Sequence, residues 1–386
     1  MRKLAYVAKI EGFMPIEGCD NIELAEVLGW KIIVRKNLYK VDDLVIYHEI
    51  DTLAPQWPLY KDDLEKRSYK IKTMKMRGAY SQGYIIPFDS VTIQSTLGNV
   101  DFKDGSFDLY VDFKKFKSFK AEEGLDLSDI LDLKKYDNED GESLEDTYRP
   151  NIKKSWIQNK INFLKWKWRS LFSSKQHKKN GSNFPSFLRK TDETRVQNLK
   201  GAISQIGQEE CYITEKIEGQ SGSFAINADK YIVCSRNMVV ADHISNNHGY
   251  VSKKYDLENK IRALKINICI QGELYGTSIQ GNYYGIDDKE FLVYSIYLID
   301  DKRYADYEET LDYVNKLDLK MVPVVDDNFI LHDDIDKLVD LSKGKSVINK
   351  NKLREGIVIR TKKKVRYSHV FSFKSINPDY LLKTDK

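Results

Sequence analysis

Lys216 is the residue in this sequence whose surroundings most directly suggest chemistry. It lies three residues before Gly219, with Glu218 between them, in the segment EKIEGQSGSF at residues 215–224. The flanking runs CYIT and SFAIN contain the β-branched and aromatic residues typical of strands. We therefore expect the lysine at a strand end or tight turn beside small residues, where a bulky anionic ligand can approach the backbone. Alone, this K-x-x-G pattern is common, and most lysines lie on protein surfaces.

Five further segments follow the lysine in a fixed order. They are SRN at 235–237, GELYG at 272–276, FLVYSIY at 291–297, REGIVIR at 354–360 and SFKSINPDYLLK at 372–383. In order and spacing the set resembles motifs I, Ia, III, IIIa, IV and V of the covalent nucleotidyltransferases, which include ATP-dependent RNA ligases, DNA ligases and mRNA capping enzymes. The resemblance implies that the Lys216 amine attacks the α-phosphate of ATP, forming lysyl-AMP and releasing pyrophosphate. An ammonium cannot attack, so the site must favour the neutral amine by desolvation or nearby cations.

The same resemblance implies an ATP-binding set around the lysine. Glu215 would read the adenine amino group, and Tyr294 would stack on the base, although a core tyrosine in a strand explains Tyr294 equally well. Arg236 would bind the ribose or an incoming 5′-phosphate, a task suited to the guanidinium fork. Lys374 would contact the α-phosphate alone, because Ile376 stands where many relatives carry a second lysine.

Glu218, Glu273 and Glu355 form an acidic set that is expected to hold Mg²⁺ or Mn²⁺. Magnesium keeps most of its water and takes few carboxylates, so glutamates holding an aquated ion on the triphosphate fit its chemistry. The resemblance makes Glu355 the main metal residue and implies that Glu273 lies near the ribose or the metal. Glu218 departs from the aspartate common at its position. Each glutamate is also consistent with a strand-end ion pair.

Residues 1–110 are expected to form an OB-like β-barrel. LAYVAKI, WKIIVRK and DLVIYHEI are short β-rich runs separated by turn residues. PIEGCDNIELAEVLGWKIIV, VDDLVIYHEID and RGAYSQGYIIP resemble the OB-type domain that precedes the catalytic domain in one branch of RNA ligases. DNA ligases and capping enzymes usually place theirs after motif V, and only three residues follow Lys383 here. In KIKTMKMR, Lys72, Lys75 and Arg77 could line a phosphate-tracking groove or a solvated face.

Residues 111–182 are expected to be a charged connector. Eleven acids and two lysines occur between Ala121 and Asp146, which favours partial disorder or a short helix with a loop. Twelve Lys/Arg residues and no acid lie between Arg149 and Lys190. Apolar residues at helical spacing over 157–171 predict a basic amphipathic helix. That helix could pack on a domain, face nucleic acid or lie on a membrane surface.

Residues 183–386 are expected to form the adenylyltransferase domain. Thr191 or Asp192 could cap a short helix containing Arg195. The resemblance makes Arg195 a candidate phosphate contact, and a surface ion pair with Asp192 is the alternative. YEETLDYVNKLDL and DIDKLVDLSKG predict helices that cover the sheets.

Composition bounds the setting of the chain. The net charge of +4 is too small to identify a partner, and the four cysteines show neither a zinc spacing nor a disulfide framework. No run of eighteen apolar residues occurs, so no membrane span is predicted. We expect an intracellular monomer in a reducing compartment such as the cytoplasm or nucleus.

The sequence thus predicts an α+β protein, with an OB-like barrel followed by a nucleotidyltransferase domain of antiparallel sheets and flanking helices. The predicted function is ATP-dependent ligation of an RNA 3′-OH to a 5′-phosphate end in RNA repair, and the sequence leaves open whether these ends belong to a nicked duplex, a broken tRNA loop or free RNA. The alternatives are a DNA ligase or mRNA guanylyltransferase with the same lysyl-nucleotide chemistry, and a nucleic-acid-binding protein whose catalytic site has decayed.

Overall fold

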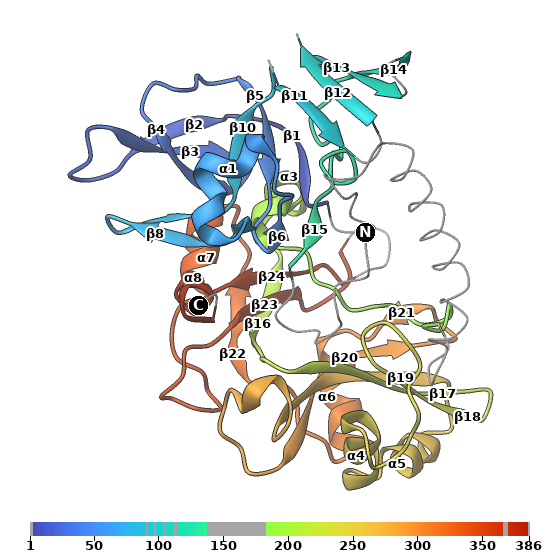
Figure 1. The fold of residues 1–386 in the computed structure, drawn as a ribbon. Coiled ribbons are helices and arrows are strands. Elements are labelled where there is room, and N and C mark those ends of the chain that lie inside the picture. The colour runs from blue at the N-terminus through green and yellow to red at the C-terminus, as the bar shows by residue number, and fades with distance from the viewer. Residues whose placement is uncertain are drawn as a thin grey trace.

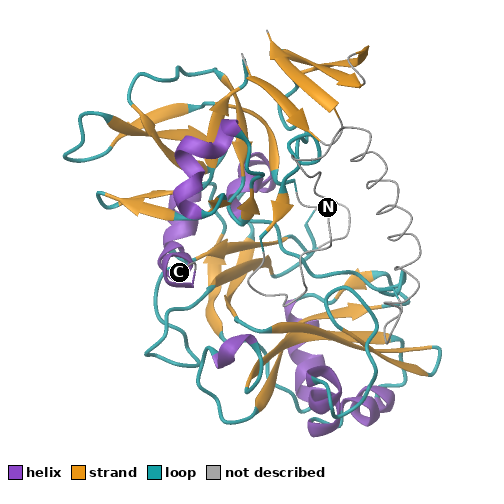
Figure 2. Cartoon of the chain, in the orientation of Figure 1, coloured by secondary structure: helices purple, strands orange, loops and turns teal. Residues whose placement is uncertain are grey.

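The computed structural model describes residues 3–89, 91–95, 98–103, 105–111, 114–136, 183–365 and 370–384. Within these residues the fold is α+β and its sheets are antiparallel, as predicted (Figures 1 and 2). The basic amphipathic helix predicted over 157–171 lies outside the described residues. No helix in the described ranges is long and apolar enough to cross a membrane.

The N-terminal domain is built from short strands around two clusters of buried apolar residues. Two three-stranded sheets have the orders β1-β5-β10 and β2-β3-β4. Their strands are β1 (Ala5–Lys9), β5 (Leu44–His48), β10 (Tyr84–Pro87), β2 (Gly12–Pro15), β3 (Ile22–Val27) and β4 (Trp30–Arg35). Alternate residues of these strands, including Trp30 and Tyr47, are buried together between the sheets. This is the barrel-like packing expected from the alternating pattern.

Smaller elements surround this core. They are β6 (Thr52–Leu53), α1 (Pro58–Leu64), η1 (Glu65–Arg67), β7 (Lys70–Ile71), β8 (Met74–Met76), β9 (Ala79–Ser81) and a four-stranded sheet of β11 (Val91–Ser95), β12 (Gly98–Lys103), β13 (Ser106–Val111) and β14 (Lys114–Lys120). The short helix that we allowed after Ala121 is not found among the described residues up to 136. That stretch forms turns and then β15 (Lys134–Lys135), which pairs with β6.

The C-terminal domain contains two larger sheets. One has the order β22-β16-β23-β24, and the other has the order β18-β17-β19-β20-β21. The strands are β16 (Glu210–Lys216), β17 (Gln220–Asn227), β18 (Lys230–Cys234), β19 (Ile268–Gly276), β20 (Lys289–Leu298), β21 (Arg303–Tyr304), β22 (Val324–Ile330), β23 (Gly356–Thr361) and β24 (Ser372–Ile376). In Figure 1 the first sheet lies between the N-terminal domain and the second sheet.

Helices cover the outer face of each sheet (Figure 2). The elements are η2 (Val196–Leu199), α3 (Lys200–Ile206), α4 (Asn247–Lys254), α5 (Leu257–Ala263), η3 (Gln280–Asn282), α6 (Tyr307–Lys316), α7 (Ile335–Asp340) and α8 (Pro378–Thr384). The two helices predicted from YEETLDYVNKLDL and DIDKLVDLSKG are confirmed as α6 and α7. A capping box between Asp306 and Glu309 begins α6.

The two domains share a core. Ile376, Tyr380 and Leu381 from the C-terminal end of the chain are buried in the same cluster as Trp30 and Tyr47. The contact joins β24 and α8 to the N-terminal barrel. Because this interface is apolar and close-packed, it holds the domains in one arrangement.

Candidate active site

Lys216 lies at the end of β16 and faces the space between the two large sheets. Side chains alternate along a strand, so Tyr212, Thr214 and Lys216 share one face of β16. Cys211 and Ile213 point the other way, into the core beneath α3 and α7. The position of Lys216 at a strand end, predicted from sequence, is therefore found in the structure.

Glu355 is the direct partner of Lys216. The lysine Nζ donates a hydrogen bond to Glu355 Oε1, and the two side chains also form an ion pair. Glu355 immediately precedes Gly356, the cross-strand neighbour of Lys216 on β23. The sequence segment REGIVIR thus delivers its glutamate to the lysine because β23 pairs in register with β16.

The other two glutamates of the acidic set have different partners. Glu218 accepts a hydrogen bond from the Tyr380 hydroxyl, and Glu273 accepts one from Ser221 Oγ at 3.3 Å. Among the residues that the structure describes, no three His, Cys, Asp or Glu side chains converge as a ready-made metal site. The arrangement fits an ion that takes one or two carboxylates and completes its shell with water and phosphate oxygens.

Lys374 lies on the same sheet face as Lys216. Its row across the sheet contains Thr214, two residues before Lys216 on β16. Lys374 pairs with Val358 on β23, whereas its neighbour Phe373 is buried in the opposite core. Burial lowers the pKa of Lys374 to about 8; Asp192 opposes this effect, and the nearby charges of Lys216 and Arg195 add to it. Two lysines therefore face one cleft, as the sequence predicted from segments far apart.

Asp192 links Lys374 to Arg236. Its Oδ1 accepts from Lys374 Nζ at 3.2 Å, and its Oδ2 accepts from the Arg236 guanidinium at 3.0 Å. Burial raises the pKa of Asp192, but Lys374 and Arg236 more than offset this and bring it down to about 2. Asp192 is therefore a carboxylate at neutral pH and holds both cations.

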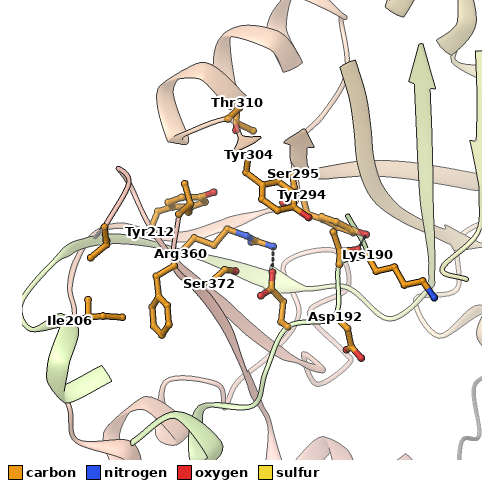
Figure 3. Close-up of a pocket in the computed structure, with 16 residues that line it drawn as sticks. Lys190, Asp192, Ile206, Tyr212, Tyr294, Ser295, Tyr304, Thr310, Arg360 and Ser372 are labelled. Atoms are coloured by element: carbon orange, nitrogen blue, oxygen red, sulfur yellow. Dashed lines mark hydrogen bonds and ion pairs between the residues drawn. The ribbon is translucent and has the colours of Figure 1, made fainter. Parts of the chain in front are cut away.

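A cavity of about 440 Å³ lies next to these groups. Figure 3 shows the rings of Tyr212, Tyr294 and Tyr304 and the Arg360 guanidinium around it. Tyr212 and Arg360 form the cross-strand row that follows Thr214 and Val358 on the Lys216 face of the sheet. The cavity thus lies on the face of the sheet that also carries Lys216. Its aromatic walls suit a flat, apolar group with a few polar edges.

Tyr294 is aimed at this cavity by a β-bulge. Gln271 pairs with Ser295 and Gly272 pairs with Val293, so Tyr294 is the extra residue between two matched pairs. A bulge re-aims the side chain of the extra residue. The Tyr294 hydroxyl forms a 2.7 Å hydrogen bond with Thr191, and burial raises its pKa.

Glu215 lies on the opposite face of β16 from Lys216. Its side chain is buried, where Oε2 accepts a hydrogen bond from the Val347 backbone N–H at 2.7 Å, and burial raises its pKa. Glu215 is not among the residues that line the cavity. The structure therefore does not bring its carboxylate together with Tyr294.

Arg195 is held at the domain interface. Its guanidinium pairs with Asp51 of the N-terminal domain at 2.7 Å, and only 10% of its side chain is exposed. The predicted helix containing Arg195 and capped by Thr191 or Asp192 is wrong, because η2 begins at Val196 with Arg195 at its N-cap. The alternative pair of Arg195 with Asp192 is also wrong, since Asp192 binds Lys374 and Arg236.

The three basic residues predicted in the N-terminal domain lie in β8 or within two residues of it. Lys75 donates to the Tyr80 hydroxyl at 3.1 Å, and Arg77 is exposed in the turn after β8. Lys72 Nζ lies 5.5 Å from the centre of the Tyr136 ring. These residues are on or near the surface, where a long ligand can reach them.

The segment at residues 190–195 is the part of the site that the sequence did not reveal. We interpreted it as a short helix and one phosphate contact, yet its side chains reach both large sheets and the N-terminal domain. The available signal was the consecutive polar run TDETR, which has no apolar residue to bury.

Comparisons with known proteins agree with this geometry. A family model described as RNA ligase matches residues 209–376, and an OB-fold domain model matches residues 4–88. Solved structures of Naegleria gruberi RNA ligase are similar at 25% identity over all of both chains: a variant with ATP and Mn at a TM-score of 0.75, the protein with pyrophosphate at 0.76, and a variant with AMP and Mn at 0.75. No curated protein gave a significant match.

The RNA ligase model spans β16 through β24, which carry Lys216, Glu355 and Lys374, and the OB-fold model spans the preceding barrel. Both the catalytic sheet and the domain order therefore agree with the full-length structural match. Residues 209–376 thus carry an RNA ligase domain with an OB-fold domain before it, and the whole chain is similar to solved RNA ligase structures.

Proposed function

We propose that this ATP-dependent RNA ligase repairs RNA by joining a 3′-OH to a 5′-phosphate end, through lysyl-AMP at Lys216 and an adenylylated RNA end. The observation that carries the proposal is that Lys216, which binds Glu355, shares one sheet face with Lys374, whose partner Asp192 lines the aromatic cavity. The ATP and Mn found with the Naegleria gruberi enzyme support the same co-substrate and a divalent ion here.

In the first step the Lys216 amine attacks the α-phosphorus of ATP. A nitrogen–phosphorus bond forms, the bond to the β-phosphate oxygen breaks, and pyrophosphate leaves. The amine must be neutral, and the ammonium of Lys374 in the same cleft disfavours a second positive charge beside it. Lys374 would also stabilise the charge that develops on the phosphoryl oxygens.

The adenine would occupy the cavity beside Tyr294. A volume of about 440 Å³ falls in the range of small-ligand sites, and the tyrosine ring offers a surface for stacking. Because Tyr212 of the cavity and Lys216 lie on the same face of β16, one extended nucleotide would contact both. Arg236 would reach the ribose or the incoming 5′-phosphate from the other sheet.

Glu355 and Glu273 would hold a Mg²⁺ or Mn²⁺ ion, with Glu218 nearby. When bound, such an ion neutralises charge on the phosphate oxygens. The protein groups do the positioning: Glu355 orients the Lys216 side chain, Ser221 orients Glu273 and Tyr380 orients Glu218.

AMP would next pass from Lys216 to the 5′-phosphate of RNA, and the 3′-OH would then attack that activated end and release AMP. Lys72, Lys75, Arg77 and Arg195 would contribute to RNA binding, so sealing should weaken as salt increases. We propose a monomer in a reducing compartment, a setting that suits the four free cysteines.

The test is covalent labelling with α-labelled ATP. Lys216→Ala should form no labelled adduct, whereas Lys316→Ala, an exposed lysine on α6, should label like the parent protein. A labelled Lys216→Ala protein would refute the assignment of the nucleophile.

Substrate choice separates this function from its alternatives. An adduct with ATP but not GTP excludes an mRNA guanylyltransferase. Sealing of an RNA 3′-OH in preference to a DNA 3′-OH excludes a DNA ligase, and absence of any adduct favours a decayed site. Splinted and unsplinted RNA then distinguish nicks from free ends.

A further inference from the structure

The segment at residues 190–195 contacts both large sheets and the N-terminal domain. Five consecutive residues make these contacts: Thr191 to Tyr294, Asp192 to Lys374 and Arg236, Glu193 to Arg360, the Thr194 carbonyl to the Lys374 backbone N–H, and Arg195 to Asp51. The contacts reach β20 of one sheet, β23 and β24 of the other, and the N-terminal domain. The segment therefore relates these elements to one another.

Asp192 makes the contact that bears on phosphate binding. Lys374 comes from β24 of the first sheet, and Arg236 follows β18 of the second. The two oxygens of one carboxylate bind the two cations at 3.2 and 3.0 Å. Since carboxylate oxygens are about 2.2 Å apart, the cations stand within roughly 8 Å of each other, the scale of a nucleotide's phosphate region.

Fold stability does not explain this arrangement. The Asp192 side chain is 55% exposed, and exposed ion pairs contribute at most about 1 kcal/mol. Lys374, by contrast, is only 19% exposed. The more exposed Asp192 thus orients the mostly buried Lys374 ammonium. Such a contact matters when a ligand must meet that ammonium in one fixed position.

We propose that Asp192 is a positioning residue for adenylylation, which holds Lys374 and Arg236 in the arrangement that receives ATP, with the α-phosphate at Lys374 and the ribose at Arg236. The proposal rests on the proposed function, because it assigns those cations to the nucleotide. Asp192 acts through its two partners and takes no part in bond making. Its two carboxylate oxygens bind Arg236 and Lys374, which come from different sheets. Among the ion pairs of the described residues, this carboxylate alone binds both cations.

Electrostatics gives the proposal a distinctive signature. The charged groups that face Lys374 are Asp192, Lys216 and Arg195, and Asp192 is the one that favours its protonated form. Replacing the carboxylate by an amide keeps the shape but removes that support. Lys374 would then lose its charge at lower pH, and Arg236 would lose its anchor.

The experiment measures the rate of lysyl-AMP formation against ATP concentration and pH for Asp192→Asn and Asp192→Glu. For Asp192→Asn we expect a KM for ATP about tenfold higher. At low ATP we also expect the rate to start falling at a pH about one unit lower than in the parent, because removing the opposite charge lets Lys374 lose its proton more easily. Asp192→Glu, which restores the charge, should recover most of the parent behaviour.

Asp312→Asn is the matched control, because it removes an exposed carboxylate from a lysine pair on α6. It should leave both the KM and the pH profile unchanged. An Asp192→Asn profile that superimposes on the parent overturns the proposal. So does a lower KM, which would mean that Asp192 competes with phosphate. If the parent protein forms no adduct, the proposed function itself fails.

Discussion

At the scale of single residues, the site depends on two lysines that have different partners in one cleft. Lys216 is paired with Glu355, whereas Lys374 is buried, faces Asp192 and has its pKa lowered to about 8. A nucleophile must lose its proton, and a phosphate-binding cation must keep one. The surroundings in the structure favour the reverse, because the Glu355 carboxylate stabilises a charged Lys216 and burial disfavours a charged Lys374. ATP and its divalent ion must therefore reverse this preference when they bind.

The first prediction concerns pH. Lys374 is charged below a pKa of about 8 and neutral above it, so lysyl-AMP formation at low ATP should fall as the pH rises through about 8. Lys374→Arg should move this fall to higher pH, because arginine stays protonated throughout. Rates between about pH 7 and 10 check it. A parent profile that stays flat above pH 8 would contradict the role of Lys374.

The second prediction concerns Tyr294. Tyr294→Ala should raise the KM for ATP roughly three- to tenfold, the amount expected from a lost aromatic stack. Tyr294→Phe keeps the ring and loses only the hydroxyl, which bonds to Thr191 and Ser221, so its KM should stay close to that of the parent. Equal effects of the two changes would show that the hydroxyl matters and the ring does not.

At the scale of elements, close approach between strands determines where the catalytic segments lie. A Cβ added at Gly219 would stand 2.2 Å from the Leu274 carbonyl oxygen, and one at Gly272 would stand 2.4 Å from that of Leu292. Real Cβ atoms do not tolerate such contacts. Gly219 is therefore needed for β17 to pair with β19, and Gly272 is needed for the bulge that aims Tyr294.

The third prediction tests this close packing. Gly219→Ala should destabilise the fold by about 2–3 kcal/mol and strongly slow adduct formation, because the clash is with backbone. Gly201→Ala is the control, since Gly201 lies in α3 with open space around it and should stabilise by about 0.5–1 kcal/mol. Urea unfolding measures both. Equal stability of the two variants would argue against a rigid contact at Gly219.

At the scale of the whole molecule, the N-terminal domain is joined to the strand that carries Lys374. Asp51 binds Arg195, and the backbone of the neighbouring Thr194 accepts a hydrogen bond from Lys374. Tyr380 joins the shared core and also binds Glu218 beside the nucleophile. The geometry of the site thus depends on how the two domains pack.

The fourth prediction tests the domain contact. Asp51→Asn should destabilise the protein by about 2 kcal/mol, because Arg195 would remain largely buried without its counter-charge. The asparagine suits the left-handed backbone at this position. Asp336→Asn breaks another domain-spanning pair, with Lys31, but Asp336 is 61% exposed and its loss should cost under about 0.5 kcal/mol. Similar losses in urea unfolding would contradict a special role for Asp51.

The sequence by itself determined the chemistry and the local structure. The strands on both sides of Lys216 and the helix at 307–316 depend on residues that are close in sequence. Strand and helix periodicities of 2.0 and 3.6 residues therefore describe them well. The segments that follow Lys216 are likewise visible in the order of the residues. The fold class was predictable for this reason, whereas the domain order and the RNA ligase activity were predictable from the resemblance of the ordered segments to known motifs.

Only the tertiary structure decided which distant side chains meet. It placed Arg195 against Asp51, 144 residues away, and set Asp192 between Lys374 and Arg236. These pairings depend on sheet register, a bulge and domain packing, which arise from the sum of many weak contacts rather than from any local pattern. A polar run such as TDETR carries no periodicity, so its partners become visible only once the strands around it are in place.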